Sequence, residues 1–186
     1  MFFVKHLRFL FLSTFIVFAA GCSTLPQELT ANGEPVITDY QQWLDADPET
    51  QPEVRLGGVI ASVQNLEDKT RIEVVNLPIG SDGKPDINQE PKGRFVAYVT
   101  GYVEPITFAK GRMITFVGET NMPEVGAVGD YEYTFPVMNV NGQRLWQIKE
   151  RVVVTETSSY LYSCRSMYCR SFDYGPKQGR VIQEVR

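Results

Sequence analysis

The amino-acid sequence predicts an all-β protein built around a small barrel. From Val54 onward, short apolar runs alternate with turn residues, and no stretch keeps the spacing near 3.6 that marks an amphipathic helix. Two of these runs, 94–100 and 112–118, are apolar at consecutive positions, as in strands that are covered on both faces or that lie at the heart of a small barrel. A chain of this length buries enough surface for a real core.

The chain opens with the layout of an export signal. Basic residues precede an apolar run at 9–20, and small residues follow this run. The run is far shorter than the ~20 residues that a helix needs to cross a bilayer. We therefore expect residues 1–21 to be removed as a signal peptide rather than retained as a membrane span.

The end of this segment, Gly21-Cys22, resembles the lipobox of bacterial lipoproteins, although Ala19 stands where that pattern prefers Leu. In such proteins the Cys thiol is alkylated with diacylglycerol, the chain is cut before it, and the new amine is acylated. The resemblance predicts lipidation at Cys22 and attachment through acyl chains, which labelled palmitate would report. Ser23 at the next position is typical of lipoproteins sent to the outer membrane, and we expect a periplasm-facing protein. A secreted protein with an unmodified Cys22 is the alternative.

Charge and histidine content exclude several function classes. Removal of 21 residues from the 186 leaves 165, with 16 basic and 22 acidic residues and a net charge near −6. Such a chain is a poor partner for nucleic acid, whose binding depends on Lys and Arg. The single histidine, His6, is lost with the signal, so a mature triad or His-ligated metal is excluded. We expect no enzyme activity, no cofactor and no metal.

Residues 22–52 are predicted to form a tether, because they are polar and carry four prolines. Inside this segment, 40–44 has the pattern of one or two helical turns, with Asp39 or Thr38 as the cap. One face of such a helix would carry Tyr40, Trp43 and Leu44. This face either packs on the domain or offers an aromatic patch to lipid or to a partner.

Residues 53–155 are predicted to form the barrel domain, and they begin with a hairpin. Its first strand, 54–64, contains Gly57-Gly58, a pair that usually marks a bulge or bend. After a turn at 65–69, the strand 70–77 alternates, with Ile72 and Val74 on one face and Arg71 and Glu73 on the solvent face. Residues 78–93 follow as a long loop, which is either functional or a simple, disordered connection.

The second half of the barrel is predicted from alternation and turn signals. We expect 119–130 to be a turn-rich connection. A strand at 131–137 then alternates, and its inner face would carry Tyr131, Tyr133, Phe135 and Val137. Asn141-Gly142 predicts a type I′ hairpin turn, with a return strand running through 145–148 towards 152–154.

The C-terminal extension, 156–186, differs from the barrel in charge. From Gln147 to the end the chain carries seven basic and four acidic residues, with aromatic residues between them: Tyr160, Tyr162, Tyr168, Phe172 and Tyr174. The mixture fits contact with an anionic polymer or lipid headgroup, or a further hairpin lying against the acidic barrel. In an oxidising periplasm Cys164 and Cys169 can pair as a disulfide within such a hairpin; free thiols and a catalytic or metal-binding pair are the alternatives.

Several motifs within residues 53–148 resemble the Slp family of starvation-inducible outer-membrane lipoproteins. They are Leu56-Gly57-Gly58-Val59-Ile60, Lys69-Thr70-Arg71-Ile72-Glu73, Gly93-Arg94-Phe95, Gly101-Tyr102-Val103-Glu104-Pro105, the run from Lys110 to Gly118, and Tyr133-Thr134-Phe135-Pro136-Val137. The resemblance implies an outer-membrane lipoprotein with a small antiparallel barrel of OB type, closed or partly open. It carries over no catalytic residue. Beyond Ile148 the chain departs from the pattern.

The sequence leaves two functions open. The first is a non-enzymatic envelope protein with a structural or interaction role, whose partner is an envelope protein or a glycan and whose link to stress or starvation rests on the resemblance. The second is a binding module for an oligosaccharide, peptide or lipid on the barrel face. An open patch of Tyr98, Tyr102 and Phe108 beside a groove would favour binding. The acidic pair Glu67-Asp68 falls in a predicted turn and is expected to be solvated.

Overall fold

The computed structural model describes residues 25–33, 35–154 and 179–186, and within them the chain is mostly β-strand. Three short helical segments come first and seven strands follow in these residues: η1 (Gln27–Leu29), α2 (Tyr40–Leu44), η2 (Pro48–Thr50), β1 (Glu53–Asn65), β2 (Lys69–Leu77), β3 (Gly93–Thr100), β4 (Met113–Val128), β5 (Tyr131–Trp146), β6 (Ile148–Val154) and β7 (Gly179–Val185). The predicted all-β class is confirmed.

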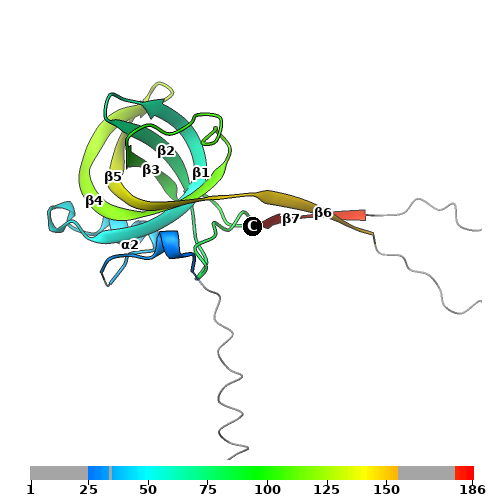
Figure 1. The fold of residues 1–186 in the computed structure, drawn as a ribbon. Helices are drawn as coiled ribbons and strands as arrows, with labels where there is room; N and C mark the ends of the chain where they lie inside the picture. Colours follow the sequence, from blue (N-terminus) through cyan, green and yellow to red (C-terminus); the bar gives the residue numbers. More distant parts are fainter. Residues whose placement is uncertain (1–24, 34, 155–178) are drawn as a thin grey trace, which may run out of the picture.

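The first five strands close into a barrel in the order β1-β2-β3-β5-β4 (Figure 1). Four of the neighbouring pairs are antiparallel, and the fifth, β3 with β5, is parallel through Val96↔Val137 and the next two pairs. The OB-like barrel that we expected is therefore present, with one parallel pair instead of antiparallel pairing throughout. A ring with an odd number of strands cannot alternate direction at every step, so one parallel contact is unavoidable.

The first hairpin forms where the alternation predicts it, with β1 and β2 joined by a turn at 66–68. The irregularity in the β1–β2 register lies between Ile60 and Ser62, so of the two alternatives for Gly57-Gly58, a bulge or a bend, the bulge is absent from this pairing. Gly58 is required for another reason. A Cβ at this position would lie 2.0 Å from the carbonyl oxygen of Val75 on the neighbouring strand, which only a glycine avoids.

The second hairpin, β4–β5, is much longer than expected. Residues 119–128 continue β4 instead of forming a connection, and the chain turns at Gly129, whose φ of 62° is in the left-handed region that favours glycine. Asn141-Gly142 lies inside β5, so the predicted hairpin turn there is wrong. Val117 pairs with Gly142 and Gly118 with Val140, which leaves Asn141 as the extra residue of a bulge.

The interior of the barrel is filled by side chains, and part of its outer face is covered by the β4–β5 hairpin. The interior is filled by side chains from all five strands, among them Leu56, Ile72, Val74, Phe95, Ile114, Phe116 and Met138. The outer half of the β4–β5 hairpin folds over β3, where Phe135 and Val137 pack on Val96. Phe135 and Val137 are therefore buried on the outer face of the sheet, while Tyr131 is exposed, which corrects the inner face that we predicted for this strand. The prediction that β3 and β4 are covered on both faces is confirmed.

The segment before the barrel packs on it from Leu25 onward, whereas we expected a tether with few core residues. Helix α2 forms where the pattern predicts it, and the Asp39 carboxylate accepts hydrogen bonds from the backbone N–H groups of Gln41 and Gln42. Tyr40 and Trp43 are buried, and the Trp43 ring meets Phe95 edge-on at 5.8 Å. Of the two alternatives for this face, the structure shows packing, with Leu44 left exposed.

Candidate functional site

A groove on the outer face of the barrel is the best candidate for a functional site among the described residues. A pocket of about 340 Å³ lies over β1, β2 and β3, between the loop that precedes β4 and the tip of the β4–β5 hairpin. A second pocket, of about 440 Å³, shares Val75, Arg94 and Val128 with the first and runs on towards Tyr131 and Tyr133. We call the two pockets together the barrel groove. Volumes of this size suit a small ligand or a short stretch of a polymer.

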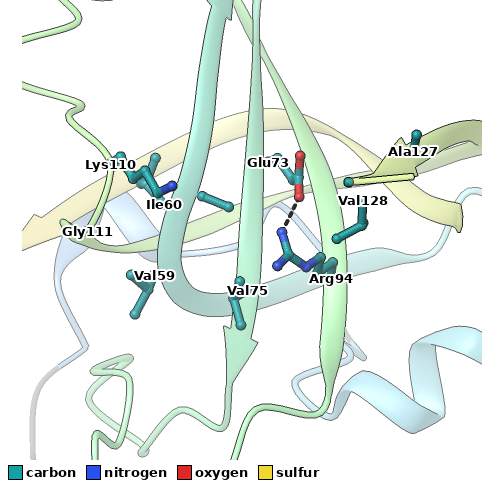
Figure 2. Close-up of a pocket in the computed structure, with 11 residues that line it drawn as sticks. Val59, Ile60, Glu73, Val75, Arg94, Lys110, Gly111, Ala127 and Val128 are labelled. Carbon is teal, nitrogen blue, oxygen red and sulfur yellow. Dashed lines mark hydrogen bonds and ion pairs between the residues drawn. The ribbon is translucent and has the colours of Figure 1, made fainter. Parts of the chain in front are cut away.

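An ion pair forms the polar centre of the barrel groove. Arg94 on β3 and Glu73 on β2 point toward each other between Lys110 on one side and Val128 on the other (Figure 2). Their Nη1 and Oε1 atoms are 2.5 Å apart, and the Ser62 hydroxyl donates to the second carboxylate oxygen at 3.3 Å. The Glu73 side chain is only 12% exposed. We expected a solvated Glu73, and this is wrong, because the Glu73 carboxylate is paired with Arg94 from the neighbouring strand and accepts from Ser62.

Two tyrosines fix the position of Arg94. Its backbone N–H donates to the Tyr133 hydroxyl at 3.2 Å, and its carbonyl oxygen accepts from the Tyr40 hydroxyl at 2.7 Å. Burial raises the pKa of Tyr40 well above its ordinary value, and the hydrogen bond to Tyr133 raises it further, so Tyr40 stays protonated and keeps its role as a donor. The floor of the barrel groove is thus held by α2 and β5 together.

A second polar network holds the hairpin tip in place over β3. The Glu124 carboxylate on β4 accepts from the Arg71 guanidinium and from the Tyr98 hydroxyl, each at 2.7 Å. Burial raises the pKa of Tyr98, and the Glu124 charge raises it further, so Tyr98 remains a donor in this network. Because Tyr98 belongs to β3, the network ties the hairpin wall of the barrel groove to its floor.

The side chains that line the barrel groove combine charged and aromatic groups. Lys110, Arg94 and Lys92 supply cations, and Lys92 is paired with Asp39 at 2.8 Å. Tyr131, 73% exposed, and the half-buried Tyr133 supply aromatic surface at the far end. Glu73 supplies the carboxylate that lines the groove, and it forms an ion pair with Arg94. In the part of the chain that the structure describes, no cluster of His, Cys, Asp and Glu could hold a metal ion.

The three aromatic residues whose open patch beside a groove would have favoured binding do not line the barrel groove. Tyr98 is engaged with Glu124, Tyr102 is exposed in the segment after β3, and Phe108 packs against the barrel interior. The aromatic side chains at the barrel groove are instead Tyr131 and Tyr133. Their alternation marks them as strand residues, but period 2 alone does not reveal that this part of β5 extends beyond the barrel and folds back over it.

Several residues to which we assigned a role from the sequence lie outside the described residues. These are the lipidation site Cys22, the cysteines Cys164 and Cys169, and the aromatic residues of the C-terminal extension. Glu67 and Asp68 lie exposed in the β1–β2 turn, as expected. Over residues 25–33, 35–154 and 179–186, the structure contains no helix with the length and apolarity that a membrane crossing requires.

Comparison with known proteins places the chain in one family. The model of the outer membrane lipoprotein Slp family matches residues 19–177, which takes in Cys22 and extends well past the 53–148 that the motifs indicate. An uncharacterized lipoprotein, YeaY, of Escherichia coli K12 is 31% identical over 76% of this chain and 73% of its own length. The outer membrane protein Slp of the same organism is 30% identical over 73% of each chain, and an uncharacterized Haemophilus influenzae protein is 38% identical over about half of each. The chain belongs to the outer membrane lipoprotein Slp family.

Proposed function

We propose that this chain is a non-enzymatic lipoprotein, anchored through acyl chains on Cys22 in the outer membrane and facing the periplasm, where it has an interaction role. The lipobox-like residues before Cys22 and the family membership support the anchor. The observation that carries the interaction role is the barrel groove, whose single carboxylate is neutralised by Arg94 and whose walls combine cations with aromatic surface. A site of this composition can bind, but it offers no paired acid and base.

The anchor is tested by replacing the thiol. We expect Cys22→Ser to move the protein from the membrane fraction to the soluble fraction and to stop incorporation of labelled palmitate, because the acyl chains have no attachment point. Cys164→Ser serves as the control, since it removes a thiol that is not in the lipobox. Unchanged fractionation and labelling of the Cys22→Ser variant would rule out the anchor.

A binding module for an oligosaccharide, peptide or lipid is the second candidate, and the exposed Tyr131 at the barrel groove favours it. A photo-crosslinking residue in place of Tyr131 should capture a glycan or an envelope protein in cells, and Lys110→Gln in the same chain should reduce this capture. The same probe in place of Tyr102, which is also exposed but lies away from the groove, is the control. Equal capture at the two positions would contradict binding in the groove.

We propose two further features of this protein. Cys164 and Cys169 form a disulfide that closes a short loop in an oxidising compartment, which is worth ~2 kcal/mol in the chain-entropy model. Alkylation of the denatured, unreduced protein should find both thiols blocked, and two free thiols would refute the pairing. A role in stress or starvation is supported by the family resemblance; quantitative immunoblotting of cells entering stationary phase tests it, and a constant level would contradict it.

A further inference from the structure

The last two strands form a ribbon that stands apart from the barrel. Strands β6 and β7 pair only with each other, and Figure 1 shows them projecting from the end of β5 as a two-stranded arm. The loop before β3 comes near the arm at Ile87 and Asn88, which line a pocket together with residues 181–183. We call residues 148–154 and 179–185 the arm.

The two faces of the arm differ in chemistry. Opposite residues of an antiparallel pair share a face and successive residues alternate, so the register assigns each side chain. One face, the apolar face, carries Ile148, Val152, Val181 and Val185 with the pair Glu150 and Gln183. The other face, the basic face, carries Lys149, Arg151, Arg180 and Glu184 with Val153 and Ile182. The one charge on the apolar face, Glu150, accepts a hydrogen bond from Gln183 at 2.8 Å.

The apolar face is open to solvent in the chain by itself. Ile148, Val152 and Val181 are 46%, 62% and 57% exposed, values that already include any cover from the neighbouring loop. An isolated two-stranded ribbon is marginally stable in water, because one layer of two strands buries too little apolar surface. An arm with this composition therefore gains stability when another apolar phase covers its apolar face.

The base of the arm lies close to the proposed lipid anchor. Val185 at the end of β7 and Leu25 both pack on the cluster of Leu29, Met113 and Trp146. Only three peptide steps separate Leu25 from Cys22, and three extended residues span at most ~11 Å. When acyl chains hold Cys22 in a bilayer, Leu25 is consequently within ~11 Å of the anchored residue, and the root of the arm packs on the same cluster as Leu25.

Charge selects a lipid surface as the partner. The basic face carries three cations and one carboxylate, whereas the mature chain as a whole has a net charge near −6. Amphipathic elements that lie in a membrane interface combine an apolar face with Lys and Arg on the other side, where they reach anionic headgroups. We infer that the apolar face of the arm lies on the anionic membrane leaflet in which Cys22 is anchored, and that the arm is a second contact of this protein with the bilayer. The inference rests on the proposed anchor.

Adjacent positions on opposite faces provide a matched test. Val181→Trp and Ile182→Trp each place an indole on the arm, on the apolar and the basic face respectively, without removing a charge. The two native tryptophans, Trp43 and Trp146, are 2% and 3% exposed and give the same background in both variants. Each full-length variant is purified with its acyl chains and reconstituted into vesicles of phosphatidylethanolamine with one part in about four of phosphatidylglycerol, a fraction that provides anionic headgroups.

We expect brominated acyl chains to quench the fluorescence of the Val181→Trp protein and to leave that of the Ile182→Trp protein close to the background of the unsubstituted chain. Val152→Trp, on the same face as Val181 and on the other strand, should behave like Val181→Trp, so that a defect in one variant does not decide the outcome. Equal quenching of the two faces would overturn the inference. So would an unquenched apolar face accompanied by crosslinks between arms of two copies, because a second copy would then be the partner.

Vesicle sedimentation separates the two proposals. If the unsubstituted protein does not sediment with vesicles, the anchor is refuted and the inference about the arm falls with it. If all variants sediment and the Val181→Trp and Val152→Trp proteins show no more quenching than the Ile182→Trp protein, the anchor stands and only the membrane contact of the arm is refuted.

Discussion

At the scale of single residues, the barrel depends on glycines at which another backbone passes too close for a side chain. At Gly58 the obstacle is the Val75 carbonyl oxygen, which would lie 2.0 Å from an added Cβ, and at Gly142 it is the Glu28 carbonyl oxygen at the same distance. The Val75 carbonyl belongs to the neighbouring strand of the barrel, so it cannot move away without disturbing the β1–β2 ladder.

We therefore expect Gly58→Ala to lower the free energy of unfolding by about 1–3 kcal/mol, the usual cost of inserting atoms into a packed site. Gly33→Ala is the matched control, because a Cβ there would meet its nearest neighbour, a Glu53 carboxylate oxygen, at an ordinary 3.5 Å. Urea denaturation followed by tryptophan fluorescence measures both. If the two substitutions cost the same, close approach of the Val75 carbonyl is not the reason for glycine at position 58.

Residue-scale patterns also show where sequence-based prediction stops. Alternation at Ile72 and Val74 correctly predicts the inner face of β2, because period 2 follows directly from strand geometry. It places Glu73 on the outer face as well, but the outer face of a sheet is exposed only when nothing covers it. Glu73 is instead paired with Arg94, which lies 21 residues further along the chain on the neighbouring strand, so no local pattern contains this contact.

At the scale of elements, α2 shows how a five-residue helix is stabilised by its N-cap residue and by its packing on the barrel. The Asp39 carboxylate accepts from two backbone N–H groups and pairs with Lys92 at 2.8 Å. The hydrogen bond from Lys92, followed by that from the Gln42 backbone, lowers the pKa of Asp39 below its ordinary 3.8. Because the folded state holds the carboxylate at a lowered pKa, the stabilisation is present above about pH 4 and is lost as the pH falls through that lowered value.

Asp39→Ala should lower the free energy of unfolding by about 1 kcal/mol at neutral pH, as expected for the loss of a helix cap. The deficit relative to the unsubstituted chain should shrink below the ordinary carboxyl pKa, because the unsubstituted cap is then protonated too. Lys92→Ala removes only an exposed ion pair and should cost less. Urea titrations of the three proteins between acid and neutral pH measure these free energies of unfolding. A loss of stability in Asp39→Ala that does not change with pH would contradict the capping role.

The long β4–β5 hairpin is the element that sequence reasoning describes least well. Residues 119–130 contain Pro123, Gly126 and Gly129, which normally indicate a loop. In the structure Pro123 falls in the register break between Asn121 and Glu124, where the ladder is already interrupted, so the strand continues past it. Of these turn residues only Gly129 lies in a turn, and the distinction between a bulge and a turn depends on the partner strand.

At the scale of the whole molecule, the chain divides into a barrel that carries the core and an arm that adds little to it. Trp43 and Trp146 are buried in the barrel, and the Trp43 and Trp146 indole N–H groups donate to Thr120 and Thr115 at 2.8 and 2.9 Å. The arm forms a separate sheet and contributes Val185 to the cluster around Trp146. The division is only partly visible in the sequence, because the change of charge after residue 147 marks the tail while the strand pattern runs on without a break.

A chain that ends at Lys149 should consequently keep a folded barrel. We expect cooperative urea unfolding, with a loss of about 1–2 kcal/mol from the missing Val185 contact, since burying one such side chain contributes about that much. Trp43→Ala in the full chain should cost about 3–5 kcal/mol, because it empties a large buried site between α2 and Phe95. A shortened chain that unfolds without cooperativity, or that loses more stability than Trp43→Ala, would mean that the arm is part of the core and not an appendage available to a membrane.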